Sequence, residues 1–140
     1  MKLSKLSSDE ILEMFSNLGV SVGVIDRHMN MIYMNEKAKW FYEFAFGSPI
    51  VVGQNVAGCH EPIHVKNIKK LLEEFATTDK PLNFFRIPDE KLNGGYLTVL
   101  HFPYVKDGQF LGIMEFNIES SMMDGGRGGY QRFFTEDDKS

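Results

Sequence analysis

An amphipathic helix near the middle of the chain most constrains what this sequence can fold into. From Val65 to Phe75, apolar residues recur at helical spacing on one face, and Lys and Glu form pairs four residues apart on the other. Pro62 precedes this helix, and the breaker-rich segment 77–81 ends it. A helix with a single apolar stripe has to cover another layer of structure. The segments on both sides of it must therefore supply that layer.

Both flanking segments contain strand-like runs. Two runs lie before the helix, joined by the turn residues 26–28, and a short helix is expected over 36–44. Three more runs follow it, with glycine-containing hairpin signals between them. The five runs span residues 20–26, 29–35, 82–88, 96–105 and 110–118. This order predicts an α+β fold, in which a five-stranded antiparallel sheet carries helices packed on one face.

A further helix is expected at the N-terminal end of the chain. Ser7 or Ser8 can cap its start, and Gly19 can end it. Its apolar residues at helical spacing are Ile11, Leu12, Phe15 and Leu18. Such a flanking helix over residues 1–19 either covers the core or offers a surface for dimerisation.

The C-terminal end has a different composition from the rest of the chain. Residues 121–140 are rich in glycine and finish in acidic residues, so we expect a flexible tail there. Residues 20–120 remain as one domain, which is an ordinary size for a single core. The 12 Phe and 8 Met in the chain suit a packed, adaptable interior.

Composition excludes several classes of protein. A net charge of −4 gives no basic surface for nucleic acid. No apolar run approaches the roughly 20 residues of a membrane span, and no signal peptide is visible. We therefore expect a cytoplasmic protein that binds neither nucleic acid nor membrane. No catalytic triad, phosphate-binding loop or other catalytic motif appears, so we do not expect an enzyme.

Three short motifs occur together in the order of one known family. In the hairpin from Val24 to Asn35, an aspartate ends the first strand and an asparagine follows the second. A glycine-led turn, Val52–Val56, precedes the long helix, and Lys106–Glu115 forms a closing hairpin. With these motifs, the arrangement from Glu10 to Ser120 resembles a PAS domain. The resemblance implies the PAS fold over 20–120, with a pocket between the sheet and the helices.

The stretch from Gly53 to His64 carries a closer resemblance. It contains the only cysteine and two of the four histidines, and we expect it to form one wall of any pocket. Its Cys59-His60-Glu61-Pro62 is similar to the Cys-His-Pro-Pro motif of bacterial PAS domains found beside hemerythrin-like domains. Glu61 replaces the first proline of that motif.

The residues of this stretch suggest several site chemistries. If the long helix already includes His64, this residue lies four before Ile68 on the inward stripe, where an imidazole could ligate haem iron. His64 is otherwise a capping or solvated residue, and His60 is either a pocket residue or a structural hydrogen-bonding residue. Cys59 is a small buried hydrophobe, a redox-sensing thiol or, with both histidines, part of a zinc site.

Aromatic and methionine side chains provide a second set of candidate pocket residues. They could line an apolar ligand pocket, or the same side chains could fill a solid core. Attachment of a chromophore to Cys59, as in photoactive yellow protein, would need a tyrosine where this chain has Met34. The set comprises Met34, Trp40, Phe41, Phe44, Phe84, Phe102, Met114 and Phe116.

The resemblance implies a sensory or signalling domain that binds a small ligand or cofactor. It would relay binding through a homodimer, made by the N-terminal helix and the outer sheet face, or through a signalling partner protein. Two alternatives remain open. One is a ligand-free scaffold for protein–protein contact, and the other is a haem-binding redox or gas sensor that uses His64 or His60.

Overall fold

Five antiparallel strands form one sheet in the order β2-β1-β5-β4-β3. The computed structural model describes residues 5–45, 49–58, 60–89 and 95–119. The strands are β1 (Ser21–Asp26), β2 (Met31–Met34), β3 (Asn83–Asp89), β4 (Gly95–Lys106) and β5 (Gln109–Glu119). The helices are α1 (Ser8–Ser16), α2 (Glu36–Trp40), the π-helix η1 (Phe41–Ala45), the 3₁₀-helix η2 (Val56–Gly58) and α3 (Pro62–Thr77). The expected α+β fold is thus confirmed.

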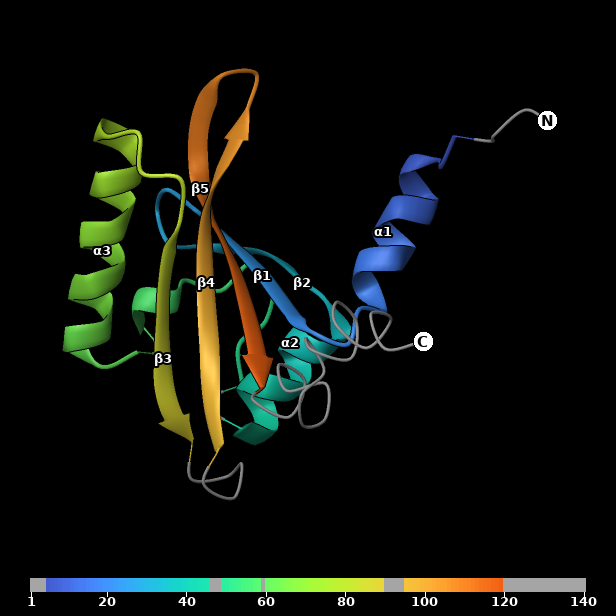
Figure 1. Ribbon diagram of the computed structural model, residues 1–140, viewed down its shortest axis with the longest axis horizontal. Coiled ribbons are helices and arrows are strands. Elements are labelled where there is room, and N and C mark those ends of the chain that lie inside the picture. The colour runs from blue at the N-terminus through green and yellow to red at the C-terminus, as the bar shows by residue number, and fades with distance from the viewer. Residues whose placement is uncertain (1–4, 46–48, 59, 90–94, 120–140) are drawn as a thin grey trace, which may run out of the picture.

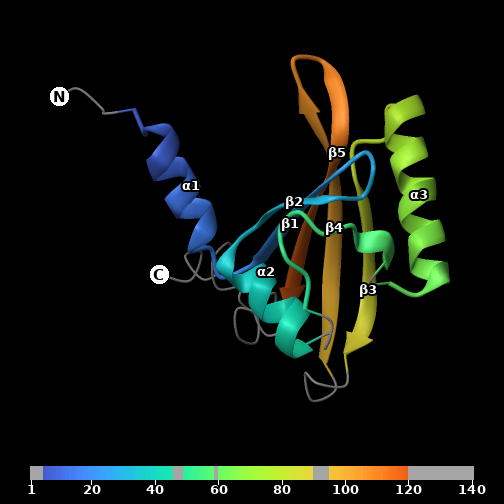
Figure 2. The same cartoon turned by 180° about the vertical axis from the view of Figure 1, so that it is seen from behind.

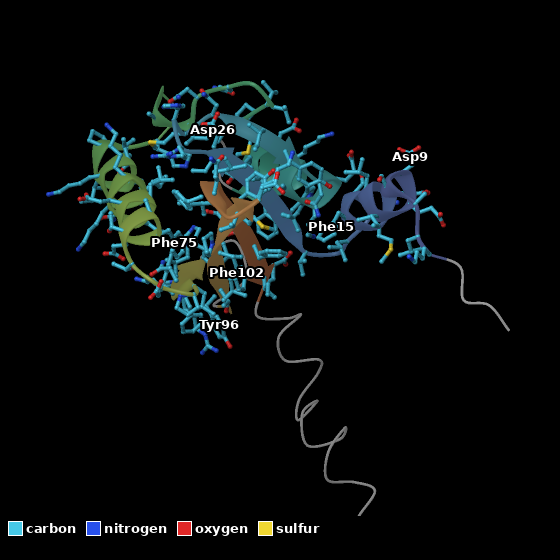
Figure 3. The ribbon with its side chains drawn as sticks, turned by 90° about the horizontal axis from the view of Figure 1, so that it is seen from above. Asp9, Phe15, Asp26, Phe75, Tyr96 and Phe102 are labelled. Carbon is cyan, nitrogen blue, oxygen red and sulfur yellow. The ribbon has the colours of Figure 1, made fainter. Side chains whose placement is uncertain are left out.

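The helices after β2 pack on one face of the sheet, as predicted (Figures 1 and 2). Here α3 contacts β5, and α2 contacts β1 and β2. We call this the inner face. α1 lies apart from the sheet, on the opposite side of the structure from α3 (Figure 3), and none of its residues is buried. No described helix is both long enough and apolar enough to cross a membrane.

Two predicted helices differ in detail from the observed ones. The short helix does not run evenly over 36–44, because α2 gives way to a π-helical turn at Phe41. The long helix starts at Pro62, where proline is favoured because the first helical N–H has no intrahelical partner. The Ser7 cap is confirmed: its hydroxyl accepts from the Glu10 N–H, and the Glu10 carboxylate accepts from the Ser7 N–H.

The segment before α3 is held beside β2 by backbone hydrogen bonds. The Gly53 N–H donates to the Met31 oxygen at 2.7 Å, and the Met31 N–H donates to the Gln54 oxygen at 2.9 Å. The Val56 N–H donates to the Met29 oxygen at 2.8 Å. This pairing extends the sheet beyond β2 and positions η2 over the inner face.

Asn35 joins α1, β1 and α2 at one buried point. Its Oδ1 accepts from the N–H groups of Val22 and Ala38, at 3.0 and 2.9 Å. Its Nδ2 donates to the carbonyl oxygens of Phe15 and Val20, at 3.0 and 2.8 Å. The side chain is fully buried, so its amide group is satisfied entirely by protein.

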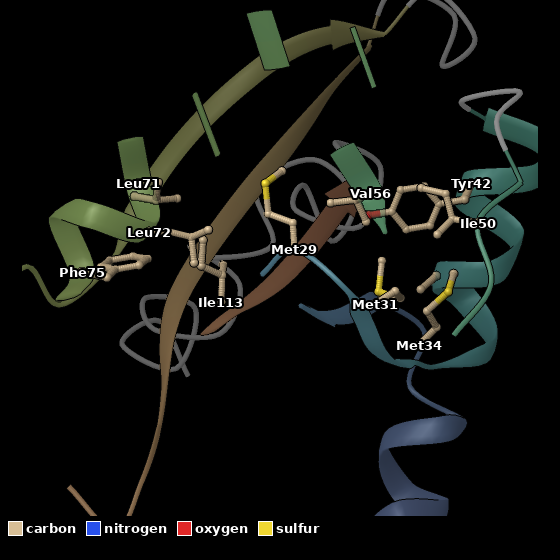
Figure 4. Packing of buried hydrophobic residues seen from close by; sticks show 11 residues of the cluster. Met29, Met31, Met34, Tyr42, Ile50, Val56, Leu71, Leu72, Phe75 and Ile113 are labelled. Atoms are coloured by element: carbon tan, nitrogen blue, oxygen red, sulfur yellow. The ribbon is translucent and has the colours of Figure 1, made fainter. Parts of the chain in front are cut away.

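The main core lies between α3, α2 and the inner face of the sheet. Figure 4 shows its two halves: Leu71, Leu72, Phe75 and Ile113 on the α3 side, and Met31, Met34, Tyr42, Ile50 and Val56 on the α2 side. Phe41, Leu97 and Val99 form a separate small cluster. Met29 lies between the two halves in Figure 4, where its flexible side chain fits an irregular space.

Gly112 is required where β5 approaches β1. A Cβ atom built at this position would overlap the carbonyl oxygen of Ile25 and come within 2.9 Å of the Asp26 Cα. Both groups are backbone, so they cannot move aside as a flexible side chain can. At Gly23, in contrast, a Cβ would meet the Met31 side chain at 3.8 Å and the Tyr33 carbonyl oxygen at 3.9 Å, both ordinary contact distances.

We therefore expect Gly112→Ala to lower the free energy of unfolding by about 3 kcal/mol, at the upper end of the usual cost of overpacking. Gly23→Ala is the matched control and should leave stability unchanged or raise it by about 0.5–1 kcal/mol, because alanine loses less backbone entropy on folding. Urea unfolding followed by circular dichroism measures both. Equal stabilities of the two variants would contradict the close approach of β5 to β1.

Candidate ligand cavity

A cavity of about 40 Å³ lies between the inner face of the sheet and the helices. Its walls come from β1, β2, β4, β5, η1, η2, α3 and the loop before α3. Seven lining residues carry no polar side-chain group: Gly23, Ile25, Met31, Val56, Ile68, Leu71 and Ile113. The other four are Tyr42, His60, His101 and Glu115. An apolar cavity with a few polar groups has the composition of a small-molecule site.

Glu115 is the centre of a polar network at this cavity. Its Oε1 accepts from the Tyr42 hydroxyl at 3.1 Å and from Asn117 Nδ2 at 2.9 Å. Its Oε2 lies 2.8 Å from His101 Nε2, which donates to it. Three different elements, η1, β4 and β5, thus meet at one carboxylate.

The hydrogen bonds of His101 also fix the role of each ring nitrogen. Because a carboxylate only accepts, Nε2 must carry a proton. Nδ1 then faces Asn83 Nδ2 at 3.4 Å, and in the neutral ring it accepts from that amide. The imidazole is therefore held from both sides, by β5 and by β3.

The network shifts the acidity of its members. Burial raises the pKa of Glu115, but the hydrogen bond and charge of His101, with hydrogen bonds from Asn117 and Tyr42, outweigh burial and lower it to about 2. Burial and the neighbouring Glu115 carboxylate raise the pKa of the Tyr42 hydroxyl well above its ordinary value. At neutral pH the site therefore contains a carboxylate and an un-ionised phenol.

Of the predicted site residues that the structure describes, His60 alone lines the cavity. Its Nδ1 lies 2.9 Å from the Val56 carbonyl oxygen, which is the kind of structural hydrogen bond expected as an alternative role. The His60 side chain therefore lines the cavity and also ties the loop before α3 to η2.

The inward position predicted for His64 is wrong. His64 belongs to α3, as expected, but its side chain is exposed and does not line the cavity. Helix side chains tilt toward the N-terminus, so a residue in the first turn projects back over the preceding loop. There the His64 ring meets the His60 ring edge to face, with centroids 6.5 Å apart.

None of the predicted aromatic and methionine pocket residues that the structure describes lines the cavity. Met34 and Phe41 are buried in the two core clusters and do not line the cavity. Trp40 is 41% exposed, with the Lys37 ammonium 4.2 Å from its ring centroid. Cys59 and the Phe44 side chain lie outside the described parts of the chain.

Four other predicted pocket residues lie on the outer face of the sheet. Successive residues of a strand point to opposite faces, and His101 and Glu115 point inward. Phe102, Met114 and Phe116 must therefore point outward, and the Phe102 and Phe116 rings pack edge to face with centroids 5.7 Å apart. Phe84, beside the inward Asn83, is also on the outer face and is 53% exposed. Hydrophobicity alone did not distinguish the two faces, because both are apolar.

Sequence analysis missed Tyr42, His101 and Glu115. A signal was present in the strands: Glu115 is the one charged residue of its run, and His101 is its paired neighbour in the β4–β5 register. Tyr42 had no comparable signal, because its position depends on the π-helical turn.

Haem does not fit this site. A cavity of about 40 Å³ is far below the roughly 300–1,000 Å³ of pockets that hold drug-sized ligands. His64, the residue predicted to bind haem iron, is exposed and lies outside the cavity. The described residues also contain no group of three or more His, Cys, Asp or Glu placed to hold a metal ion.

The low pKa of Glu115 makes a prediction about stability. Because the pKa in the folded state is below the ordinary value of 4.5, the carboxylate contributes stability above pH 4.5 that is lost as the pH falls toward 2. The change corresponds to at most about 3 kcal/mol. Glu115→Gln should therefore be destabilised at pH 7 and approach the wild type in acid, as measured by urea unfolding from pH 7 to pH 3.

The control for this measurement is Glu13→Gln, which removes an exposed carboxylate from α1. It should keep the pH dependence of the wild type. If Glu115→Gln also keeps the wild-type pH dependence, Glu115 is not stabilised in its ionised form by this network.

Comparison with known proteins identifies the fold. The chain resembles the C-terminal domain of a Streptococcus mutans protein (TM-score 0.67, 20% identity, covering 85% of this chain and 90% of the other). It also resembles the PAS domain of BvgS from Bordetella pertussis (0.56, 15%, 94% and 98%) and a PAS domain from Colwellia psychrerythraea (0.54, 18%, 79% and 94%). No curated protein sequence matches. A family model described as "PAS domain" matches residues 11–119, and the chain therefore belongs to the PAS domain family.

Proposed function

We propose that this PAS domain is a sensor that binds a small ligand in the cavity and relays binding through a dimer or partner contact. The observation that carries this proposal is the Glu115 network, which connects the cavity walls on η1, β4 and β5. A ligand that binds Glu115 differently in two conformations would shift their populations.

Strand β5 offers a route from the cavity to the outside of the domain. Asn117, two residues after Glu115, also contacts Ser21 at the start of β1, with 3.5 Å between Nδ2 and Oγ. Glu119, two further on, forms a 3.2 Å ion pair with Lys37 of α2. One strand face therefore contacts the cavity, the strand that follows α1, and α2. Movement of β5 would therefore change the contacts at the cavity, at β1 and at α2.

The exposed apolar side of α1 suits a second copy of the chain. Leu12 and Phe15 are 56% and 36% exposed, and Ile11 and Leu18 beside them are also exposed. Exposed apolar surface of this kind, on a helix with no buried residue, is typical of a protein–protein contact. A sensor histidine kinase from Vibrio cholerae is among the structures that this chain resembles (TM-score 0.51, 14% identity, covering 78% and 85%). Its description supports a signalling role for this domain.

A ligand-free scaffold is the second candidate. The small volume of the cavity favours it, because such a core is nearly full. The similarity of residues 59–62 to the Cys-His-Pro-Pro motif fits either function. His60 and Pro62 can have the same structural role in both, since His60 ties the loop and Pro62 starts α3.

The sensor proposal is tested by a thermal-shift screen of small polar metabolites against the wild type and Gly23→Val. Valine suits a strand, and its methyl groups should enter the cavity beside Met31. A ligand at one hundred times its Kd should add about 2.7 kcal/mol to the stability of the wild type and nothing to the variant. If no compound stabilises the wild type, or if every active compound acts equally on both, the scaffold is favoured.

The dimer proposal is tested by Leu12→Asp and Phe15→Asp. A charge on the α1 surface should abolish its apolar association, and the molar mass by light scattering should fall from twice the 16.0 kDa of one chain to that of one chain. The core should remain folded, because α1 buries no residue against it. Glu13→Gln, on the same helix, should remain dimeric. An unchanged mass in both aspartate variants would rule out α1 as the dimer contact.

A further inference from the structure

The hydrogen-bond donors around the cavity are already used within the protein. The Tyr42 hydroxyl and His101 Nε2–H both donate to Glu115, at 3.1 and 2.8 Å. His60 Nδ1 lies 2.9 Å from a carbonyl oxygen, which can only accept, so this nitrogen carries the proton. His101 Nδ1 faces Asn83 and not the cavity lining. None of these side chains has a further donor for a ligand.

Acceptor groups, in contrast, remain in the same lining. A carboxylate can accept about four hydrogen bonds, and Glu115 receives three, two on Oε1 and one on Oε2. In a neutral His60 protonated at Nδ1, Nε2 is an acceptor. The polar part of the cavity therefore offers lone pairs and needs a ligand with N–H or O–H groups.

The charge of the cavity lining also favours a ligand with N–H or O–H groups. Among the described lining residues, Glu115 is the one carboxylate, and there is no lysine or arginine. With a neutral His101 the lining is negative, and with a protonated His101 it is neutral overall. An anionic ligand would find neither a free donor nor excess positive charge, whereas a cationic one would face the carboxylate.

The size of the cavity limits the ligand further. An enclosed water molecule needs a cavity volume of about 10–15 Å³. A cavity of about 40 Å³ therefore has room for about three or four non-hydrogen atoms. The remaining walls are apolar, with Ile25, Ile68, Leu71 and Ile113 among them. A short alkyl chain with one polar end would match both parts of the lining.

We infer that the cavity recognises a small primary amine in its ammonium form, with the N–H groups on Glu115 and the alkyl part against the isoleucine and leucine side chains. This inference rests on the proposed ligand-binding function and specifies its ligand class. The ammonium is a cation with three donors, and it complements a lining that has acceptors and no spare donor.

The experiment compares three probes of similar size: n-propylamine, n-propanol and propionate. Binding is followed by methyl NMR of protein labelled at isoleucine and leucine, at pH 7. The methyl signals of Ile25, Ile68, Leu71 and Ile113 should shift saturably, while that of Ile11 on α1 should not. We expect n-propylamine to bind at least tenfold more tightly than n-propanol, and propionate to give no saturable shift.

Two variants of the network should act in opposite directions. Glu115→Gln removes the negative charge and should reduce the affinity for n-propylamine to that for n-propanol. Tyr42→Phe removes a donor from Glu115 Oε1, so it frees an acceptor and should tighten n-propylamine binding severalfold. If Glu115→Gln does not fold, Tyr42→Phe still tests the role of the carboxylate, because unchanged or weaker amine binding in it would contradict this role.

The outcomes separate this inference from the sensor proposal. Propionate binding as tight as n-propylamine would overturn the amine inference and still support a ligand cavity. No saturable shift with any probe would also overturn the inference, and the metabolite screen against Gly23→Val would then decide the sensor proposal independently. Amine shifts that persist unchanged in Gly23→Val would place binding outside the cavity and overturn the inference as well.

Discussion

The four hydrogen bonds of the Asn35 side-chain amide hold together the elements on which the rest of the structure depends. Oδ1 fixes the start of α2 against β1, and Nδ2 fixes the end of α1 and the residue before β1. No other side chain of similar size has two acceptor positions and two donors in this geometry. Aspartate would lose both donors, and leucine would leave four backbone groups without these partners. The direction in which α1 leaves the sheet is thereby connected to the position of α2.

Periodicity in the sequence predicted the sheet well, because it depends on local pattern. Each strand was expected within two residues of its observed ends. The same pattern did not predict which face of the sheet is covered by the helices. Hydrophobicity predicts Phe102, Met114 and Phe116 as pocket residues, but they lie on the outer face, which is also apolar. In a sheet, the assignment of faces depends on which side the helices cover, and strand alternation alone does not encode that.

The site itself depended on contacts between residues distant in sequence. Tyr42 and Glu115 are 73 residues apart, and their contact follows from the π-helical turn at Phe41. No local pattern predicts such a turn, which adds one residue to a helical repeat and redirects the next side chain. His64 shows a limit of local patterns as well. It lies four residues before Ile68, as expected for one face of a helix, but α3 begins only two residues before it. Helical spacing therefore does not predict the orientation of a side chain in the first turn.

The two edges of the sheet differ in a way that affects how molecules can associate. The edge at β2 is occupied by the chain itself through the backbone hydrogen bonds of Gly53, Gln54 and Val56. The other edge, β3, has no neighbouring strand among the described residues, and Phe85 and Ile87 on it are partly exposed. Among the described residues, β3 is therefore the longer unpaired edge at which the sheets of two molecules could pair. Pairing through this edge alone joins two molecules into a closed pair and does not extend into a continuous intermolecular sheet.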